Sequence, residues 1–139
     1  MNPPNTDIFP KVKQWIDYGD EDLRLARHAL TLSGGCPYRL IAYHAQQCTE
    51  KYLKAYLVFH CIDFPYTHNI SRLLELCGEK SKWPEEVYEA EELTPFAITT
   101  RYPGEDEKVT KKEALRAIDT AAKVRQVVRK TLKKEGFFF

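Results

Sequence analysis

The 139-residue chain lacks the usual features of secreted, metal-binding and membrane proteins. Its four cysteines form no C-x-x-C pair, which argues against zinc sites and thioredoxin-like sites. Its longest strongly apolar run, Ala55 to Phe59, is far too short to span a bilayer. The N-terminus has no signal-peptide pattern, and we expect residues 1–9 to form a flexible leader. These absences predict a cytoplasmic protein with reduced cysteines and no membrane partner.

The sequence motifs of the common enzyme classes are also absent. The chain has no Walker loop, no G-x-G-x-x-G, no G-x-S-x-G and no H-E-x-x-H. It also lacks the E-x-x-H pairs of di-iron helical bundles. Conventional hydrolase, dehydrogenase and metalloenzyme chemistries therefore lack their residues, and we expect no cofactor and no metal ion.

Charge is balanced over the whole chain but divided along it. The net charge of +1 argues against general binding of polyanions, and we expect no DNA partner. Residues 79–107 carry nine acidic and three basic side chains, whereas residues 108–134 carry ten basic and two acidic ones. Two neighbouring helices that neutralise each other would explain this division, and a basic stripe for phosphate groups is the alternative. We favour neutralisation, because no aromatic residue lies among the basic ones to stack on a base.

Apolar residues recur at intervals of three and four along most of the chain, which predicts helices. Stop and start signals place these helices at about 10–33, 37–60, 69–77, 84–100 with a bend at Thr94-Pro95, and 110–135. Short connections join them. The pattern predicts one all-α domain at 10–135, an antiparallel up-and-down helical bundle of four long helices plus one short helix.

An apolar C-terminal tail, residues 136–139, follows the last expected helix. Its three phenylalanines, Phe137, Phe138 and Phe139, would form an exposed apolar patch unless they dock somewhere. The tail can be disordered, fold back on the bundle or pack in a dimer, and the sequence does not choose between these.

Polar residues interrupt the apolar faces of the first two expected helices. Asp22 lies on the stripe of the first helix, where an unpaired carboxylate is costly. We predict that Asp22 pairs with Lys51 of the second helix. A ribbon of polar residues follows one side of that helix: His44, Gln47, Glu50, Lys51 and Lys54. The ribbon either fixes the register of the helices or faces a ligand, and both interpretations remain open.

One candidate catalytic pair, Arg39 and His44, lies in the second expected helix. Arginine can hold a phosphate with two hydrogen bonds and histidine can act as general acid or base, so the pair could cleave RNA at a 2′-hydroxyl. Such cleavage would need no metal ion. Any Arg and His five positions apart match the pattern, so a structural histidine is the competing interpretation.

Three further polar residues lie at element boundaries. Arg101 and Tyr102 are in a turn before the last helix, where they could anchor a phosphate and stack on a base, or pin the turn to the bundle. His68 lies at the start of the short helix, and we expect it to make a capping or tertiary hydrogen bond.

Several of these segments together resemble the HEPN domain, named for higher eukaryotes and prokaryotes nucleotide-binding. The most specific part is A-Q-Q-x-x-E-K-x-x-K-A at residues 45–55. The other parts are Trp15 with Asp22-Leu23 and Ala26, Thr67-His68-Asn69-Ile70 leading to Leu73-Leu74, and Arg101-Tyr102-Pro103. The resemblance covers residues 11–134. It implies a five-helix bundle, usually a homodimer, often made beside a small nucleotidyltransferase.

The resemblance also implies a function and its residues. The HEPN chain would bind nucleotide or RNA, or serve as the toxin of a toxin–antitoxin pair, while the nucleotidyltransferase partner supplies catalysis. Catalytic members have Arg, four to six residues, then His near the start of the last long helix; only Arg39 and His44 have this spacing here, in the second helix. We therefore expect an accessory protein that binds nucleotide or RNA. The alternatives are a metal-independent endoribonuclease toxin and a purely structural dimeric module. The candidate nucleotide-binding and phosphate-binding residues are Asp22, His44, Gln47, Glu50, Lys51, Lys54, Arg101 and Tyr102.

Overall fold

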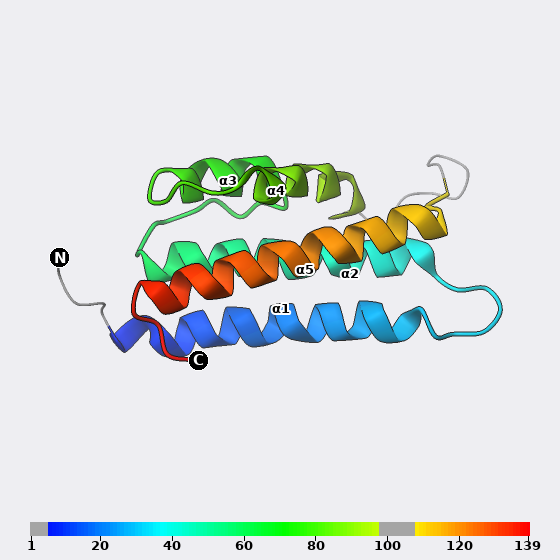
Figure 1. Cartoon of the computed structure of the whole chain (residues 1–139), viewed down its shortest axis with the longest axis horizontal. Helices are drawn as coiled ribbons and strands as arrows, with labels where there is room; N and C mark the ends of the chain where they lie inside the picture. Colours follow the sequence, from blue (N-terminus) through cyan, green and yellow to red (C-terminus); the bar gives the residue numbers. More distant parts are fainter. Residues whose placement is uncertain (1–5, 98–107) are drawn as a thin grey trace.

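The computed structural model describes residues 6–97 and 108–139, and every regular element in these residues is helical (Figure 1). The prediction of an all-α bundle is confirmed. In chain order the elements are the 3-10 helix η1 (Thr6–Ile8), α1 (Phe9–Ala29), α2 (Tyr38–Phe59), α3 (Ile70–Gly78), α4 (Glu85–Tyr88), the 3-10 helix η2 (Glu89–Ala97) and α5 (Lys111–Lys134).

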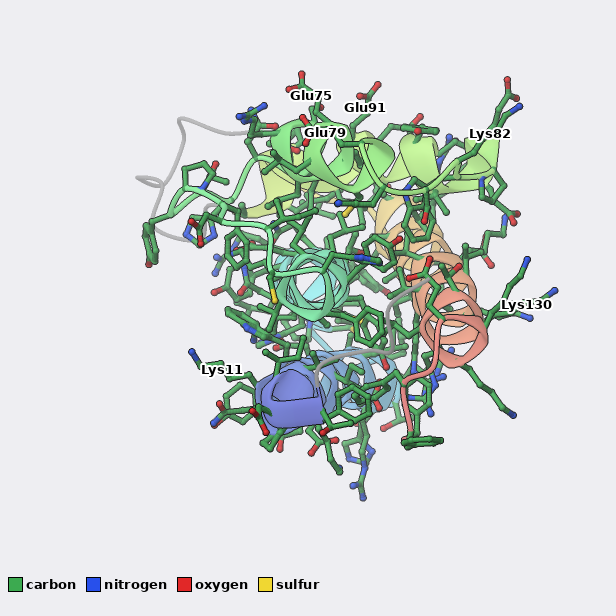
Figure 2. The ribbon with its side chains drawn as sticks, turned by 90° about the vertical axis from the view of Figure 1, so that its left-hand side faces the viewer. Lys11, Glu75, Glu79, Lys82, Glu91 and Lys130 are labelled. Carbon is green, nitrogen blue, oxygen red and sulfur yellow. The ribbon has the colours of Figure 1, made fainter. Side chains whose placement is uncertain are left out.

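The helix α2 is the centre of the bundle. It contacts α1, α3, η2 and α5, and Figure 2 shows it end-on with α1 below, α5 to one side and the shorter helices above. Most of its side chains are buried, because apolar neighbours cover it on three sides. Polar residues on α2 therefore face other helices, which makes their partners decisive for any site. In the described residues, no helix has both the length and the apolar character needed to cross a bilayer.

The predicted helix boundaries differ from the structure in two places. The first helix ends at Ala29 instead of Ser33, and the chain turns through Gly34 and Gly35, which have φ values of 65° and 61°. The expected fourth long helix is a single α-helical turn, α4, continued by the 3-10 helix η2. Pro95 lies inside η2, and its missing N–H and ring disfavour a regular α-helix there.

Helix ends in the structure follow known capping motifs. The predicted capping box of Thr110 and Glu113 is present at the start of α5. Both α2 and α5 end in a Schellman motif, in which the residue after the cap has a positive φ. That residue is Cys61 (φ 56°) after α2 and Gly136 (φ 105°) after α5. Gly136 then directs the chain back against the bundle.

The C-terminal tail folds back instead of extending away. Phe137 is buried between two other rings, with centroid distances of 4.8 Å to Phe9 and 6.2 Å to Phe59. Phe9 is the first residue of α1, and residues 6–8 form η1. Residues 6–9 therefore belong to the ordered bundle and not to the expected leader of residues 1–9, of which residues 1–5 lie outside the described part.

Candidate functional site

Asp22 of α1 is paired with two residues of α2. Its Oδ2 accepts a hydrogen bond from the Lys51 ammonium, which confirms the predicted pair, and its Oδ1 lies 2.8 Å from Nδ1 of His44. The carboxylate is buried, so these two partners offset the cost of removing it from water. Because a carboxylate accepts hydrogen bonds, the neutral His44 ring carries its proton on Nδ1, and Nε2 is then the acceptor nitrogen of the ring.

The second ring nitrogen of His44 reaches solvent. Nε2 has no hydrogen-bond partner among the described residues, and it is not among their buried unpaired atoms. The side chains of His44 and Lys51 are 26% and 23% exposed. Gln47 lies between them on the same side of α2, and its Nε2 donates to the Oε1 of Gln46 at 2.7 Å. We call His44, Gln47 and Lys51 the His44 ridge.

The other two residues of the polar ribbon, Glu50 and Lys54, are buried inside the protein. They are 3% and 5% exposed, and the Lys54 Nζ lies 2.6 Å from the Glu50 Oε1. The other oxygen of Glu50 accepts from Gln46 Nε2 at 2.9 Å and lies 3.0 Å from His68 Nδ1. The tertiary hydrogen bond expected of His68 is therefore confirmed. The side chain of Asn69 provides the cap of α3 by accepting from a backbone N–H.

Hydrogen bonds keep the buried Glu50 carboxyl ionised. Burial alone would raise the pKa of the Glu50 carboxyl, but hydrogen bonds from Lys54, His68 and Gln46 outweigh it and hold that pKa below its ordinary value. The Lys54 ammonium also lies 5.5 Å from the ring centroid of Trp15 and 5.7 Å from that of Phe64. Since both charges are satisfied within the chain, a ligand would have to displace these bonds to reach them.

The remaining predicted residues lie apart from the Asp22 cluster. Arg39 is exposed in the first turn of α2. Residues five apart leave an α-helix about 140° apart around its axis, so Arg39 projects in a different direction from His44. One chain alone therefore gives no geometric support for a phosphate shared by these two residues. Arg101 and Tyr102 lie outside the described residues.

A second polar cluster, which the sequence analysis missed, joins α1 to α2 and α5. Asp20 accepts hydrogen bonds from the Tyr52 hydroxyl and from Arg125 Nε, the latter at 2.7 Å, and Arg129 lies 3.7 Å from its other oxygen. Burial, reinforced by Asp20, raises the pKa of Tyr52 well above its ordinary value. The signal in the sequence was the spacing of Arg125 and Arg129, four residues apart beside the apolar stripe of the last helix.

Charges of the acidic and basic segments are only partly neutralised by each other. Arg116 of α5 pairs with Glu92 of η2 at 3.0 Å, as the neutralisation interpretation expects. Two acids of the acidic segment, Glu79 and Glu91, lie on the outer edge of the layer formed by α3, α4 and η2, near Glu75, which pairs with Arg72 at 2.8 Å (Figure 2). Several lysines of α5 have no ion pair within residues 6–97 and 108–139: Lys111, Lys112, Lys130, Lys133 and Lys134. Within the described residues, both surfaces thus keep charged side chains that have no ion pair.

Comparisons with known proteins agree with this architecture. A family model described as "HEPN domain" matches residues 12–131. The chain is similar to TT1696 from Thermus thermophilus, with 28% identity, a TM-score of 0.74, and coverage of 86% of this chain and 97% of that one. It is also similar to ST0689, an archaeal HEPN homologue, with 28% identity, a TM-score of 0.70, and coverage of 87% and 97%. No curated protein matches the chain. The match to the family model spans most of the sequence, and the chain belongs to the HEPN domain family.

Proposed function

We propose that this chain binds nucleotide or RNA through the His44 ridge. The observation that carries the proposal is the state of the His44 ring, whose Nδ1 is held by Asp22 while Nε2 reaches solvent. A histidine fixed in this way presents an oriented acceptor to the amino group of a base or to a ribose hydroxyl. The HEPN family is named for nucleotide binding, and His44 and Lys51, which flank the buried Gln47, are the residues of the polar ribbon whose side chains are partly exposed.

Each residue of the Asp22 cluster has a different part in this proposal. Asp22 organises the site by holding His44 and Lys51 across the contact between α1 and α2. The ammonium of Lys51 has two further protons with which to bind a phosphate. Gln47 contacts the base. Glu50 and Lys54, being buried and paired, support α2 from behind and do not touch the ligand.

We further propose that the chain is a cytoplasmic homodimer that acts beside a separate small nucleotidyltransferase, in a module of the toxin–antitoxin type. This part rests on the family likeness. Light scattering on the purified protein tests the dimer. If the neighbouring reading frame encodes a short protein with the paired carboxylates of a nucleotidyltransferase, co-purification of the two chains tests the partnership; a monomer and an unrelated neighbour would contradict it.

An endoribonuclease is the second candidate, because Asp22 and His44 form a carboxylate–imidazole pair. In such a pair the exposed Nε2 can take a proton from a 2′-hydroxyl, and the carboxylate stabilises the imidazolium that forms. Arg39 is directed away from His44 within one chain, so the phosphate would need another cation, of which Lys51 is the nearest on the ridge. A purely structural module is the third candidate, since every charge of the cluster already has a partner.

Binding and cleavage of a labelled 12-residue oligouridine separate the three candidates. We expect His44→Ala and Lys51→Ala to weaken binding, measured by fluorescence anisotropy, by about tenfold or more, as for loss of a hydrogen bond to a charged group. Lys11→Ala is the matched control, because Lys11 is an exposed lysine on α1 (Figure 2). Cleavage that disappears in folded His44→Ala protein identifies the ribonuclease. If the two variants only lower the melting temperature, the ridge is structural.

A further inference from the structure

The C-terminal tail and the last turns of α5 enclose a pocket of about 760 Å³. We call it the tail pocket; it is lined by Arg129, Lys130, Lys133 and the three phenylalanines 137–139. The volume lies within the range of about 300–1,000 Å³ that is usual for small-molecule sites. The Schellman motif at Gly136 creates the pocket, because it turns the tail back along α5.

Two of the three phenylalanines present their rings to solvent. Phe137 is anchored in the core, whereas Phe138 and Phe139 are 76% and 47% exposed. The guanidinium of Arg129 lies 4.1 Å from the ring centroid of Phe139, and Asp20 and Tyr52 hold Arg129 from behind. Exposed rings beside a fixed guanidinium are planar surfaces on which another planar group can stack.

Two of the cations at the pocket, Lys130 and Lys133, form no ion pair within the described residues. Lys130 and Lys133 are exposed and have no acidic partner in the described part of the chain, and Figure 2 shows Lys130 pointing away from α5. Their attraction for an anion is therefore not offset by an ion pair within the described residues. Aromatic residues and cations do lie together here, contrary to the expectation from sequence order, because the tail brings the phenylalanines back to α5.

We propose that the tail pocket binds a nucleobase together with its phosphate, from single-stranded RNA or from a free nucleotide. The base stacks on Phe138 or Phe139, and Lys130 and Lys133 hold the phosphate. A concave pocket lined by three cations suits a planar anion. Insertion into a bilayer would instead need an apolar surface that protrudes from the protein. The pocket lies at the end of the bundle where α1 begins and α5 ends, whereas α2 begins at the other end, so this site is separate from the His44 ridge (Figure 1).

The test is fluorescence anisotropy with the full chain and labelled 12-residue oligouridine, with AMP as competitor. We expect Lys130→Ala/Lys133→Ala to weaken binding about tenfold and to reduce its salt dependence, since fewer counterions are released. Phe138→Ala and Phe139→Ala should each weaken it by at least about fivefold, the effect of losing one stacking partner. The matched control is Lys111→Ala/Lys112→Ala, which removes from the other end of α5 two exposed lysines that have no ion pair in the described residues.

The outcomes distinguish the sources of the ligand and the two sites. If micromolar AMP displaces the oligouridine, the ligand of the pocket is a free nucleotide. If AMP does not displace the strand, the ligand is RNA. The proposal is overturned if the Lys130/Lys133 variant loses no more affinity than its control, or if an abasic strand binds equally well and the Phe variants have no effect. It is also overturned if the chain binds phosphatidylserine vesicles through Phe138 but not the oligouridine. The same variants measured in His44→Ala protein, in which the ridge no longer contributes, report the tail pocket alone, so failure of the His44 ridge does not affect the result.

Discussion

Removal of Glu50 tests whether the buried half of the polar ribbon is structural. In Glu50→Ala protein, the Lys54 ammonium loses the carboxylate that it contacts at 2.6 Å and remains almost fully buried. Gln46 and His68 lose their acceptor in the same change. We therefore expect Glu50→Ala to be among the most destabilising single changes in this chain.

The size of the destabilisation follows from the unpaired Lys54 charge that remains in the interior. Breaking a buried ion pair on one side costs about 3–5 kcal/mol of unfolding free energy, because an unpaired charge stays in the interior. That is a large part of the roughly 5–15 kcal/mol that stabilises a typical domain. A second variant, Glu50→Leu/Lys54→Met, removes both charges. It should recover about half or more of the loss, with the remainder due to the Gln46 Nε2 group, which keeps only a 3.4 Å bond to the His68 carbonyl.

Urea unfolding followed by circular dichroism measures these differences. Asp17→Ala is the matched control, because Lys13 and Asp17 form an ion pair with the same i,i+4 spacing on an exposed helix face. It should cost less than about 0.5 kcal/mol. The reasoning is refuted if Glu50→Ala is no more destabilising than this control, or if the double variant is less stable than Glu50→Ala alone.

Three further predictions concern helix packing, a helix end and pH. Gly19→Ala should destabilise the fold by about 1–3 kcal/mol, because the new Cβ would lie 3.0 Å from Cδ2 of the buried Tyr52; an unchanged or raised urea midpoint would contradict this. Cys61→Gly should stabilise it by about 0.5–1 kcal/mol by relieving a positive φ of 56°, and Gly136→Ala, at the equivalent position of α5, should destabilise it in the same assay. Because the folded state lowers the pKa of Glu50, its contribution is present above about pH 4.5 and is lost as the pH falls through the lower pKa of the folded state. Glu50→Gln should flatten the pH dependence of unfolding in that window, and an unaltered slope would exclude Glu50 as its source.

Much of the bundle could be predicted from the sequence, because apolar spacing and capping residues act locally. The capping box at Thr110 and the pairing of Asp22 with Lys51 are both confirmed. The second was predictable because a carboxylate on an apolar stripe needs a partner on the facing helix. The shortness of α4 was not predictable, because the effect of Pro95 on a helix depends on how η2 packs against α2 and α3.

Tertiary contacts decide which residues of the polar ribbon are buried and which are partly exposed. Helical spacing put Glu50 and Lys51 on one side of α2 but could not say which one solvent would reach. His68, 18 positions later in the chain, covers Glu50 and seals it, whereas Lys51 stays at the edge of the α1–α2 contact. The tail pocket was hidden for the same reason, since residues 137–139 meet Arg129 only after the chain reverses at Gly136.

The most direct test of the central claim, that a ligand reaches His44 and not the buried pair, is a side-chain NMR titration. Labelled histidine rings of the Lys130→Ala/Lys133→Ala protein are followed as oligouridine is added, so that the tail pocket does not contribute. We predict that the His44 ring signals move progressively, while those of His60, which is paired with Glu135 at 2.6 Å, stay in place. Binding of the oligouridine with the His44 signals unmoved would contradict the claim.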